Sequence, residues 1–377
     1  MKSSFSQTPA LLLKVLLLLL MIGGCGKKNA TEPKPDPNAD IPTDPANVTV
    51  PAPAVNNLKP AATFAKTSGN DNRIRLNLLG MLDPTNNNLP IVFTANQNLY
   101  ITEDDVVQGI LVKPAGNNNV LLADVAFIVD NSGSMAEEAD SVANSIAQFA
   151  TRLAASGLDA RFGCVGYDDG GNVSGAINLT TAGRLNSYLN RRISNIPLRG
   201  TSRTRGFAGT DSVQLLNTAR TYAPTIVGEN GVVAIRFAQQ LFNWRAGAQR
   251  VYINFTDEPT QPNRDAAWAT ALLCQQLSGV ATIHTIWSGG DTTFFRETEL
   301  LNEKPWRMSY CTGGTIKVIP SSAQNLNLAD LPVTNALANS YLVEFITANP
   351  TAAHTVTITV KTGARADGRT VYPNITY

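Results

Sequence analysis

The middle of the chain alternates between short apolar runs and segments whose apolar residues recur at helical spacing. Residues 125–129 are apolar without interruption, which predicts a strand buried on both faces of a parallel sheet. Residues 251–255 predict a second buried strand. Apolar side chains at a spacing of three or four residues predict a helix in the segment between these strands. They are Val142, Ile146, Phe149 and Leu153. The alternation predicts an α/β fold with a doubly wound, mostly parallel sheet over residues 121–338.

Further elements follow from the same pattern. Residues 161–167 and 173–179 predict an antiparallel pair of strands at an edge of the sheet, joined by a turn rich in Asp and Gly. The remaining pattern predicts strands at 280–287 and 315–319, and helices at 181–193, 233–244, 266–277, 293–302 and 323–338.

The two flanks of this region, residues 61–120 and 339–377, instead alternate between apolar and polar positions. The alternation is seen at Ile74, Leu76 and Leu78, and again at Val356, Ile358 and Val360. Each flank alone has too few strands to cover an apolar face. We therefore predict that the flanks pair in one small β-sandwich, into which the α/β domain is inserted.

The first residues have the features of a targeting segment. Residues 11–22 form a largely apolar run that is short for a membrane span and is followed by small residues, so residues 1–24 predict a signal peptide. Residues 22–25, with the sequence IGGC, resemble a bacterial lipobox, which implies lipidation of Cys25. An ordinary secretory signal with an incidental Cys is the alternative. Gly26, in place of an Asp, favours the outer membrane as the destination.

Residues 25–60 combine many prolines with polar side chains. Such a stretch cannot bury a core of its own, so it predicts an extended, mobile tether. The tether would hold the rest of the chain away from the membrane.

The composition narrows the range of functions. The 377 residues carry a formal net charge of +1, so no basic excess indicates nucleic-acid binding. The two histidines, His284 and His354, both lie in predicted strands. The sequence contains no convincing zinc-ligand spacing, nucleophile–base pair or phosphate-binding loop. We therefore do not expect an enzyme.

Oxygen-bearing side chains stand where the two buried strands end. Asp130 ends the first strand, Ser132 and Ser134 follow at two-residue spacing, and Asp257 follows the second strand. Open α/β sheets bind ligands at the carboxyl ends of their strands. Carboxylate and hydroxyl oxygens suit Mg²⁺, Mn²⁺ or Ca²⁺ rather than zinc or copper. The pattern predicts a divalent-cation site, and loop caps made by the same side chains are the alternative.

The spacing Asp130-x-Ser132-x-Ser134 resembles the metal-ion-dependent adhesion site of von Willebrand factor type A domains. The resemblance implies that the two buried strands are neighbours in the sheet. It also implies that Asp257 closes the site from the opposite side.

The family supplies a further Thr from a Gly-rich loop that opens a helix. Thr210 fits this position, and Thr201 is the alternative. The resemblance implies that Ser132, Ser134 and Thr210 coordinate the ion directly or nearly so, while the two Asp residues act largely through water. Mg²⁺ is the default ion because it prefers six oxygens and retains water, with Mn²⁺ or Ca²⁺ as alternatives.

The resemblance also implies a disulfide. Some bacterial relatives of this fold have a pair of cysteines at places that correspond to Cys274 and Cys311, and export makes a disulfide possible. Cys164 lies in a predicted apolar strand and is expected to be a small buried residue.

These features predict a lipid-anchored protein of the bacterial cell envelope. Its cation would keep one position open for an Asp or Glu of a protein ligand, or for another ligand that bears a carboxylate. A structural or assembly role, in which the ion only stabilises the fold, is the alternative, and a metal-dependent hydrolase is a third possibility. Three arginines near Thr210 form a basic rim: Arg199, Arg203 and Arg205. This rim could select an acidic partner, and a solvated loop is the alternative.

Overall fold

The structure is a computed structural model. It describes residues 36–377 except for 68, 88, 116–120, 157, 169, 171–172, 194–195, 198–206, 211, 220, 224–225, 325, 329–330, 332–333, 335 and 338. The predicted signal peptide, Cys25 and the start of the tether lie outside these residues. Among the helices that are described, none combines the length and apolarity that a membrane crossing requires.

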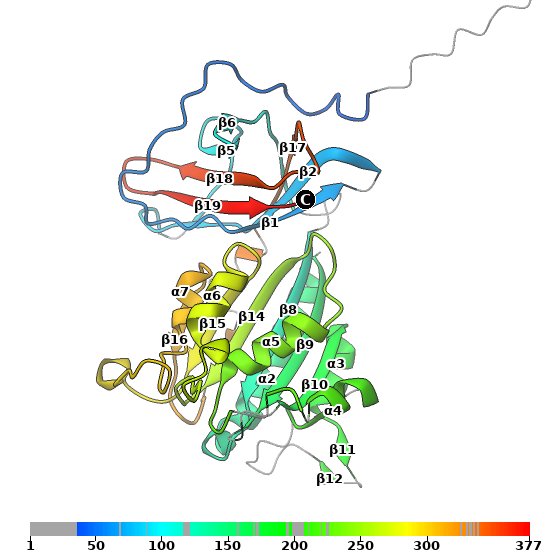
Figure 1. Ribbon diagram of the computed structural model, residues 1–377, viewed down its shortest axis with the longest axis vertical. Coiled ribbons are helices and arrows are strands. Elements are labelled where there is room, and N and C mark those ends of the chain that lie inside the picture. Colours follow the sequence, from blue (N-terminus) through cyan, green and yellow to red (C-terminus); the bar gives the residue numbers. More distant parts are fainter. Residues whose placement is uncertain are drawn as a thin grey trace, which may run out of the picture. The chain divides into compact units, whose positions relative to one another are not determined.

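The centre of the chain folds into a seven-stranded sheet with the order β13-β10-β9-β8-β14-β15-β16. β8 (Leu122–Asp130) and β14 (Gln249–Thr256) are parallel neighbours near its middle (Figure 1). Only the pairing of β9 with β10 is antiparallel in this sheet as described. The other strands are β9 (Asp159–Tyr167), β10 (Val173–Thr180), β13 (Gly209–Thr210), β15 (Thr282–Trp287) and β16 (Ile316–Val318). This mixed, mostly parallel sheet confirms the predicted fold class.

Helices cover both faces of the sheet (Figure 1). Because successive side chains of a strand point to opposite faces, Phe127 packs in one core with α2 and α3, and Ile128 packs in another with α4, α5 and α6. The helices are α2 (Ala139–Ala155), α3 (Ala182–Leu189), α4 (Val213–Ala219), α5 (Gly231–Leu241), α6 (Thr270–Leu277) and α7 (Arg307–Cys311). Short 3₁₀ turns cover Ser134–Ala136, Ala266–Trp268 and Thr292–Phe294.

The two flanks pair in a sandwich of two four-stranded sheets, ordered β1-β2-β17-β7 and β19-β18-β5-β6. β2 pairs with β17 and β5 pairs with β18, so each sheet contains strands from both flanks. One core holds Ile74 and Val343 from the first sheet and Ile101 and Ile358 from the second, which confirms the predicted pairing of the flanks. The strands are β1 (Ala62–Thr67), β2 (Asn70–Leu78), β5 (Leu99–Glu103), β6 (Val106–Val107), β7 (Leu111–Pro114), β17 (Tyr341–Ile346), β18 (His354–Lys361) and β19 (Asp367–Ile375). Two short hairpins are formed by β3 (Leu82–Asp83) with β4 (Leu89–Pro90), and by β11 (Arg192–Ile193) with β12 (Ile196–Pro197).

Residues 40–60 pack on the sandwich. The buried carboxylate of Asp367 accepts hydrogen bonds of 2.6, 2.9 and 2.6 Å from the backbone N–H groups of residues 54–56. Leu58 is buried in the core of the sandwich. Prolines cannot donate to a strand ladder, but a carboxylate can bind the N–H groups of an irregular segment. The prediction of one mobile tether over residues 25–60 is therefore wrong for residues 40–60.

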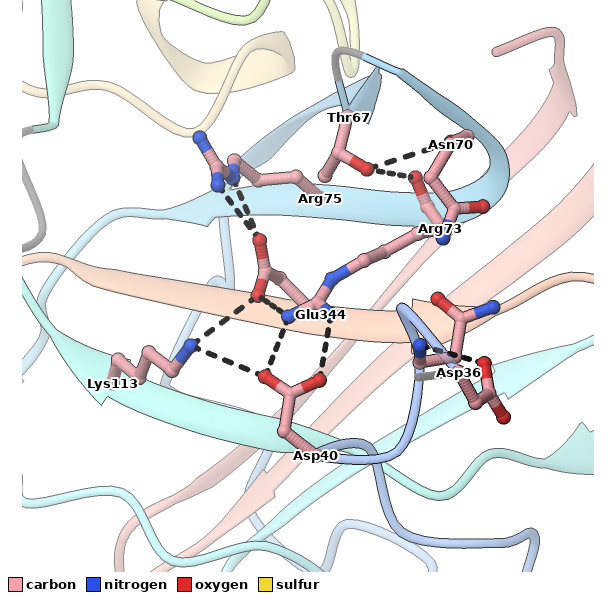
Figure 2. Close-up of polar contacts among 9 residues, drawn as sticks. Asp36, Asp40, Thr67, Asn70, Arg73, Arg75, Lys113 and Glu344 are labelled. Carbon is pink, nitrogen blue, oxygen red and sulfur yellow. Dashed lines mark hydrogen bonds and ion pairs between the residues drawn. The ribbon is translucent and has the colours of Figure 1, made fainter. Parts of the chain in front are cut away.

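Figure 2 shows a group of charged side chains, four from strands of the first sheet and Asp40 from the segment before β1. We call this group the arginine cluster: Asp40, Arg73, Arg75, Lys113 and Glu344. The Glu344 side chain, 3% exposed, accepts hydrogen bonds from Arg73 (2.6 Å) and Arg75 (2.8 Å). Asp40 accepts two hydrogen bonds from Arg73, of 2.7 and 2.9 Å. Burial alone would raise the pKa of Glu344, but the hydrogen bonds from Arg73 and Arg75 outweigh it and hold the pKa below its ordinary value.

The helix predicted at residues 293–302 is wrong. This stretch holds only a three-residue 3₁₀ turn, and Leu300 has a φ of 58°, outside the helical region. The carbonyl of Leu300 accepts a hydrogen bond from the N–H of Arg264 (2.7 Å). The end of the stretch closes a tight turn instead, in which Thr298 and Asn302 exchange backbone hydrogen bonds of 2.9 and 2.8 Å.

Other predicted helices are shorter than expected. The helix predicted at 181–193 ends at Leu189, because the residues that follow pair in the hairpin of β11 and β12. The helix predicted at 266–277 begins as an α-helix at Thr270, after a 3₁₀ turn. The helix predicted at 323–338 falls partly outside the described residues.

Candidate metal centre

Asp130 is the last residue of β8 and is only 1% exposed. Its Oδ1 accepts a hydrogen bond from the backbone N–H of Ser132 (3.0 Å), which begins the tight loop after the strand. Its Oδ2 accepts a hydrogen bond from the hydroxyl of Thr256 (3.1 Å), the last residue of β14. The ends of the two central strands are therefore tied to each other at this carboxylate.

The loop after β8 brings two hydroxyl groups to the same place. The Oγ atoms of Ser132 and Ser134 lie 2.9 Å apart. The hydroxyl of Ser134 donates a hydrogen bond of 3.1 Å to Oδ1 of Asp257, which directly follows β14. The structure thus brings together Asp130, Ser132, Ser134 and Asp257.

A third carboxylate, that of Glu229, joins this group. One carboxylate oxygen from each of Asp130, Glu229 and Asp257 lies within 4.8 Å of the others. We call these three residues the acidic cluster.

Glu229 was not among the site residues predicted from the sequence. It stands two residues before α5, whose N-cap residue Asn230 accepts a hydrogen bond from Val232 N–H (2.9 Å). Its backbone is held by Gln261, whose side chain accepts from Glu229 N–H (3.2 Å) and whose N–H donates to the Glu229 carbonyl (2.9 Å). The available signal was a glycine-flanked loop, residues 228–231, that opens a helix with an acidic residue inside it.

The prediction that Thr210 belongs to the site is wrong. Thr210 lies on β13, and its register partners across the sheet are Ala176 on β10, Val165 on β9 and Ile128 on β8. Three strand spacings separate β13 from β8, or about 14 Å. The Thr210 hydroxyl donates a hydrogen bond to the carbonyl of Ser212 instead (2.8 Å). The alternative Thr201 and the arginines of the predicted basic rim lie outside the described residues.

Burial and like charge both act on the acidic cluster. Burial raises the pKa of Asp130, and the negative charge of Asp257 raises it further. Hydrogen bonds with Glu229 and Ser132 act in the opposite direction without cancelling this effect. Burial and the charge of Asp257 therefore oppose the ionised state of Asp130.

Close packing fixes the position of Asp257. A Cβ atom on Gly289 would lie 2.1 Å from the carbonyl oxygen of Asp257 and 2.4 Å from the ring of Trp287. Only glycine fits at this position without moving the backbone. The end of β15 therefore supports the loop that carries Asp257.

The donor set fits a hard divalent cation. It consists of three carboxylates and two hydroxyls, all oxygen ligands, which suit Mg²⁺, Mn²⁺ or Ca²⁺. A divalent cation among the carboxylates would favour their ionised forms and so offset the repulsion in the acidic cluster. The residues present thus match the kind of ion that the sequence predicted.

The remaining predicted residues lie elsewhere in the fold. Cys274 and Cys311 form a disulfide with an S–S distance of 2.11 Å, and Cys164 is a buried free thiol. His284 is buried on β15, where Nδ1 accepts a hydrogen bond from Thr315 N–H (3.2 Å). Burial lowers the pKa of His284 to about 4, which makes it a poor general base near neutral pH.

The match to one protein family agrees with this geometry. Residues 124–285 match the family model of the von Willebrand factor type A domain, and the match includes the whole acidic cluster. The matched residues run from β8 into β15, so this part of the sheet, with the helices between its strands, is similar to a von Willebrand factor type A domain. No curated protein matches the chain. Among solved structures, the chain is similar to the pilus adhesin SpaC from Lactobacillus rhamnosus GG in its open conformation, with 11% sequence identity and a TM-score of 0.35. That match covers 84% of this chain and 47% of the adhesin, so the chain spans about half of the adhesin's length.

Proposed function

We propose that this domain binds one divalent cation at the acidic cluster and, through that ion, an acidic group of a protein ligand. The observation that carries the proposal is the convergence of three carboxylates with the hydroxyls of Ser132 and Ser134 at the carboxyl ends of β8 and β14. Mg²⁺ is the first candidate, with Mn²⁺ and Ca²⁺ as alternatives.

The residues that would hold the ion come from three separate loops. Ser132 and Ser134 follow β8, Glu229 precedes α5, and Asp257 follows β14. Asp130 lies deepest, at 1% exposure, and binds the loop backbone through Ser132 N–H. We therefore assign Asp130 to orienting the loop as well as to attracting the ion.

Glu229 lowers the net positive charge of the site when the ion is bound. A third carboxylate neutralises more of the ion's charge than the two that the sequence predicted, which weakens the attraction of the ion for an acidic ligand. The contacts around the ion must then supply a larger share of the affinity. A protein ligand can make such contacts, whereas a free carboxylic acid cannot.

The N-terminal sequence suggests where the domain acts. We propose that residues 1–24 are removed, that Cys25 is lipidated, and that the protein is held at the bacterial cell envelope, in the outer membrane. Since residues 54–58 pack on the sandwich, the tether that we propose is limited to the residues before them.

A thermal melt tests the ion site. The chain is treated with EDTA and melted with and without added Mg²⁺, Mn²⁺ or Ca²⁺. An ion at about 100 times its Kd should stabilise the fold by about 2.7 kcal/mol. Asp130→Ala should abolish this response, and Glu137→Ala, a change at an exposed neighbouring acid, should keep it. No response of the wild type to any of the three ions would contradict the proposal.

A capture experiment tests the ligand. Envelope proteins retained on the immobilised chain in Mg²⁺ should be released by EDTA and should not bind to Asp130→Ala. Stabilisation by the ion without any ion-dependent capture would favour a structural role in the envelope. Turnover of esters, phosphoesters or peptides would instead indicate a metal-dependent hydrolase.

A further inference from the structure

Glu138 is a buried acid just behind the acidic cluster. The residue is 1% exposed and stands at the N-cap position of α2, four residues after Ser134. Short polar side chains such as Asp, Asn, Ser and Thr commonly cap a helix from this position. The Glu138 side chain makes no such bond, and its Oε1 accepts a hydrogen bond of 2.7 Å from the hydroxyl of Ser288.

Ser288 links Glu138 to the end of the central sheet. Ser288 directly follows β15, and its N–H donates a hydrogen bond of 3.1 Å to the carbonyl of Thr256 at the end of β14. Its Oγ also lies 3.7 Å from Sδ of Met135, within the loop that follows β8. The next residue after Thr256 is Asp257. A short chain of contacts therefore runs from the start of α2 to the backbone beside a carboxylate of the acidic cluster.

The loop between β8 and α2 depends on such outside contacts. Neither the 3₁₀ turn that starts at Ser134 nor α2 has a side-chain hydrogen bond at its N-cap. The start of an uncapped helix is held less firmly, because its first N–H groups lack side-chain partners. The bond from Ser288 to Glu138 supplies a fixed point at the end of this loop.

We propose that Glu138 is a positioning residue, which holds the loop of Ser132 and Ser134 against the end of β14. The inference rests on the proposed cation site. Glu138 itself does not touch the ion and acts through Ser288 and the backbone of the loop. Residues that orient the ligands of a metal in this way commonly affect its affinity by a factor of 10 to 100.

The chemistry of Glu138 supports this role. Burial raises the pKa of Glu138 to about 7, against the opposing effect of the Ser288 hydrogen bond. Burying an acid costs stability, so an apolar residue would serve simple packing better. A glutamine has nearly the same shape and keeps the oxygen that accepts from Ser288, so Glu138→Gln should preserve the positioning.

The experiment measures the Kd for Mn²⁺ by isothermal titration calorimetry at pH 6.5, on the full chain, well below its melting temperature. Glu138→Ala should raise the Kd at least tenfold, and Glu138→Gln should stay within about twofold of the wild type. Glu137→Ala is the matched control, because this exposed acid adjoins Glu138 and should leave the Kd unchanged.

Ser288→Ala removes the same hydrogen bond from its donor side. It keeps the test possible if the Glu138→Ala chain does not fold. It should raise the Kd as much as Glu138→Ala, and the double variant should be no weaker than either single one. If Glu138→Ala and Ser288→Ala lower the melting temperature in EDTA but leave the Kd unchanged, the role is structural and the inference is overturned. Equal loss of affinity in Glu138→Gln and Glu138→Ala would also overturn it. A wild type that binds no Mn²⁺ contradicts the proposed site itself, which is a different result.

Discussion

The acidic cluster and the arginine cluster solve the same physical problem in opposite ways. Each contains a carboxylate that is almost completely buried, Asp130 in one and Glu344 in the other. Glu344 is surrounded by Arg73 and Arg75, and its pKa is lowered despite its burial (Figure 2). Asp130 instead lies within 4.8 Å of the carboxylates of Glu229 and Asp257, and its burial, together with the charge of Asp257, raises its pKa.

The two regions differ in the source of the positive charge that balances their buried carboxylates. In the arginine cluster the chain itself supplies the cations, so the cluster is complete once the sandwich has folded. In the acidic cluster, carboxylates and hydroxyls converge in the way that oxygen ligands surround an ion. The stability of the first region should therefore be insensitive to divalent cations, and that of the second should depend on them.

Glu344→Ala should produce the largest loss of stability. It removes the acceptor shared by Arg73, whose side chain is 13% exposed, and Arg75. Hydrogen bonds to a charged group contribute about 1.5–3 kcal/mol each, so losing those from both arginines should lower the free energy of unfolding by about 3 kcal/mol, while Arg73 keeps its pair with Asp40. Urea unfolding should give the same loss in EDTA and in Mg²⁺. A loss that depends on Mg²⁺ would show that the two clusters are coupled.

The stability of the two regions should change with pH in opposite directions. The pKa of Glu138, beside the acidic cluster, rises from 4.5 to about 7 on folding. The folded state therefore binds this proton more tightly, and its contribution to stability is lost as the pH rises from about 4.5 to 7. Glu344 has a lowered pKa, so its contribution is lost only as the pH falls below about 4.5.

In EDTA, the free energy of unfolding should fall by about 2 kcal/mol between pH 5 and 7.5 because of Glu138. Glu138→Gln should flatten this part of the curve, and saturating Mg²⁺ should reduce it in the wild type. Urea unfolding at several pH values measures the slope. A slope that is the same in Glu138→Gln and the wild type would contradict the assignment.

Glu229→Thr tests whether the third carboxylate sets the choice of ion. The substitution leaves a site with two carboxylates and adds a hydroxyl. Ca²⁺ takes more carboxylate oxygens than Mg²⁺, so its Kd should rise about tenfold, or 1.4 kcal/mol, and that of Mg²⁺ should rise less. Glu258→Ala removes an acid next to Asp257 but outside the acidic cluster, and it is the control for net charge. Equal losses for both ions would show that Glu229 contributes charge without selectivity.

The central strands and their polar ends could be predicted from the sequence because each depends on a short stretch. Residues 125–129 are apolar because both faces of β8 are buried, and the run ends at Asp130 where the chain leaves the core. Asp257 follows β14 for the same reason. Parallel pairing of the two strands then brings these residues together without further information.

The third carboxylate of the acidic cluster could not be predicted in this way. Thr210 and Glu229 both lie near glycines in loops that precede helices, and local sequence does not distinguish them. The sheet order decides, because β13 pairs at the far side of β10, whereas α5 packs on β8 and β9. Such an order depends on contacts between residues far apart in the chain.

Of these substitutions, Lys113→Ala should cause the smallest loss of stability. The Lys113 side chain is 33% exposed, and Nζ lies 3.6 Å from Glu344 and 3.8 Å from Asp40. Long contacts at the surface are weak, so the loss should be about 0.5 kcal/mol at low salt. In 1 M NaCl, where the screening length is about 3 Å, the loss should vanish, while that of Glu344→Ala should persist. Urea unfolding of both variants at the two salt concentrations measures this. A loss for Lys113→Ala as large as that for Glu344→Ala would mean that the number of cations, rather than the burial of the acid, determines the stability of the arginine cluster.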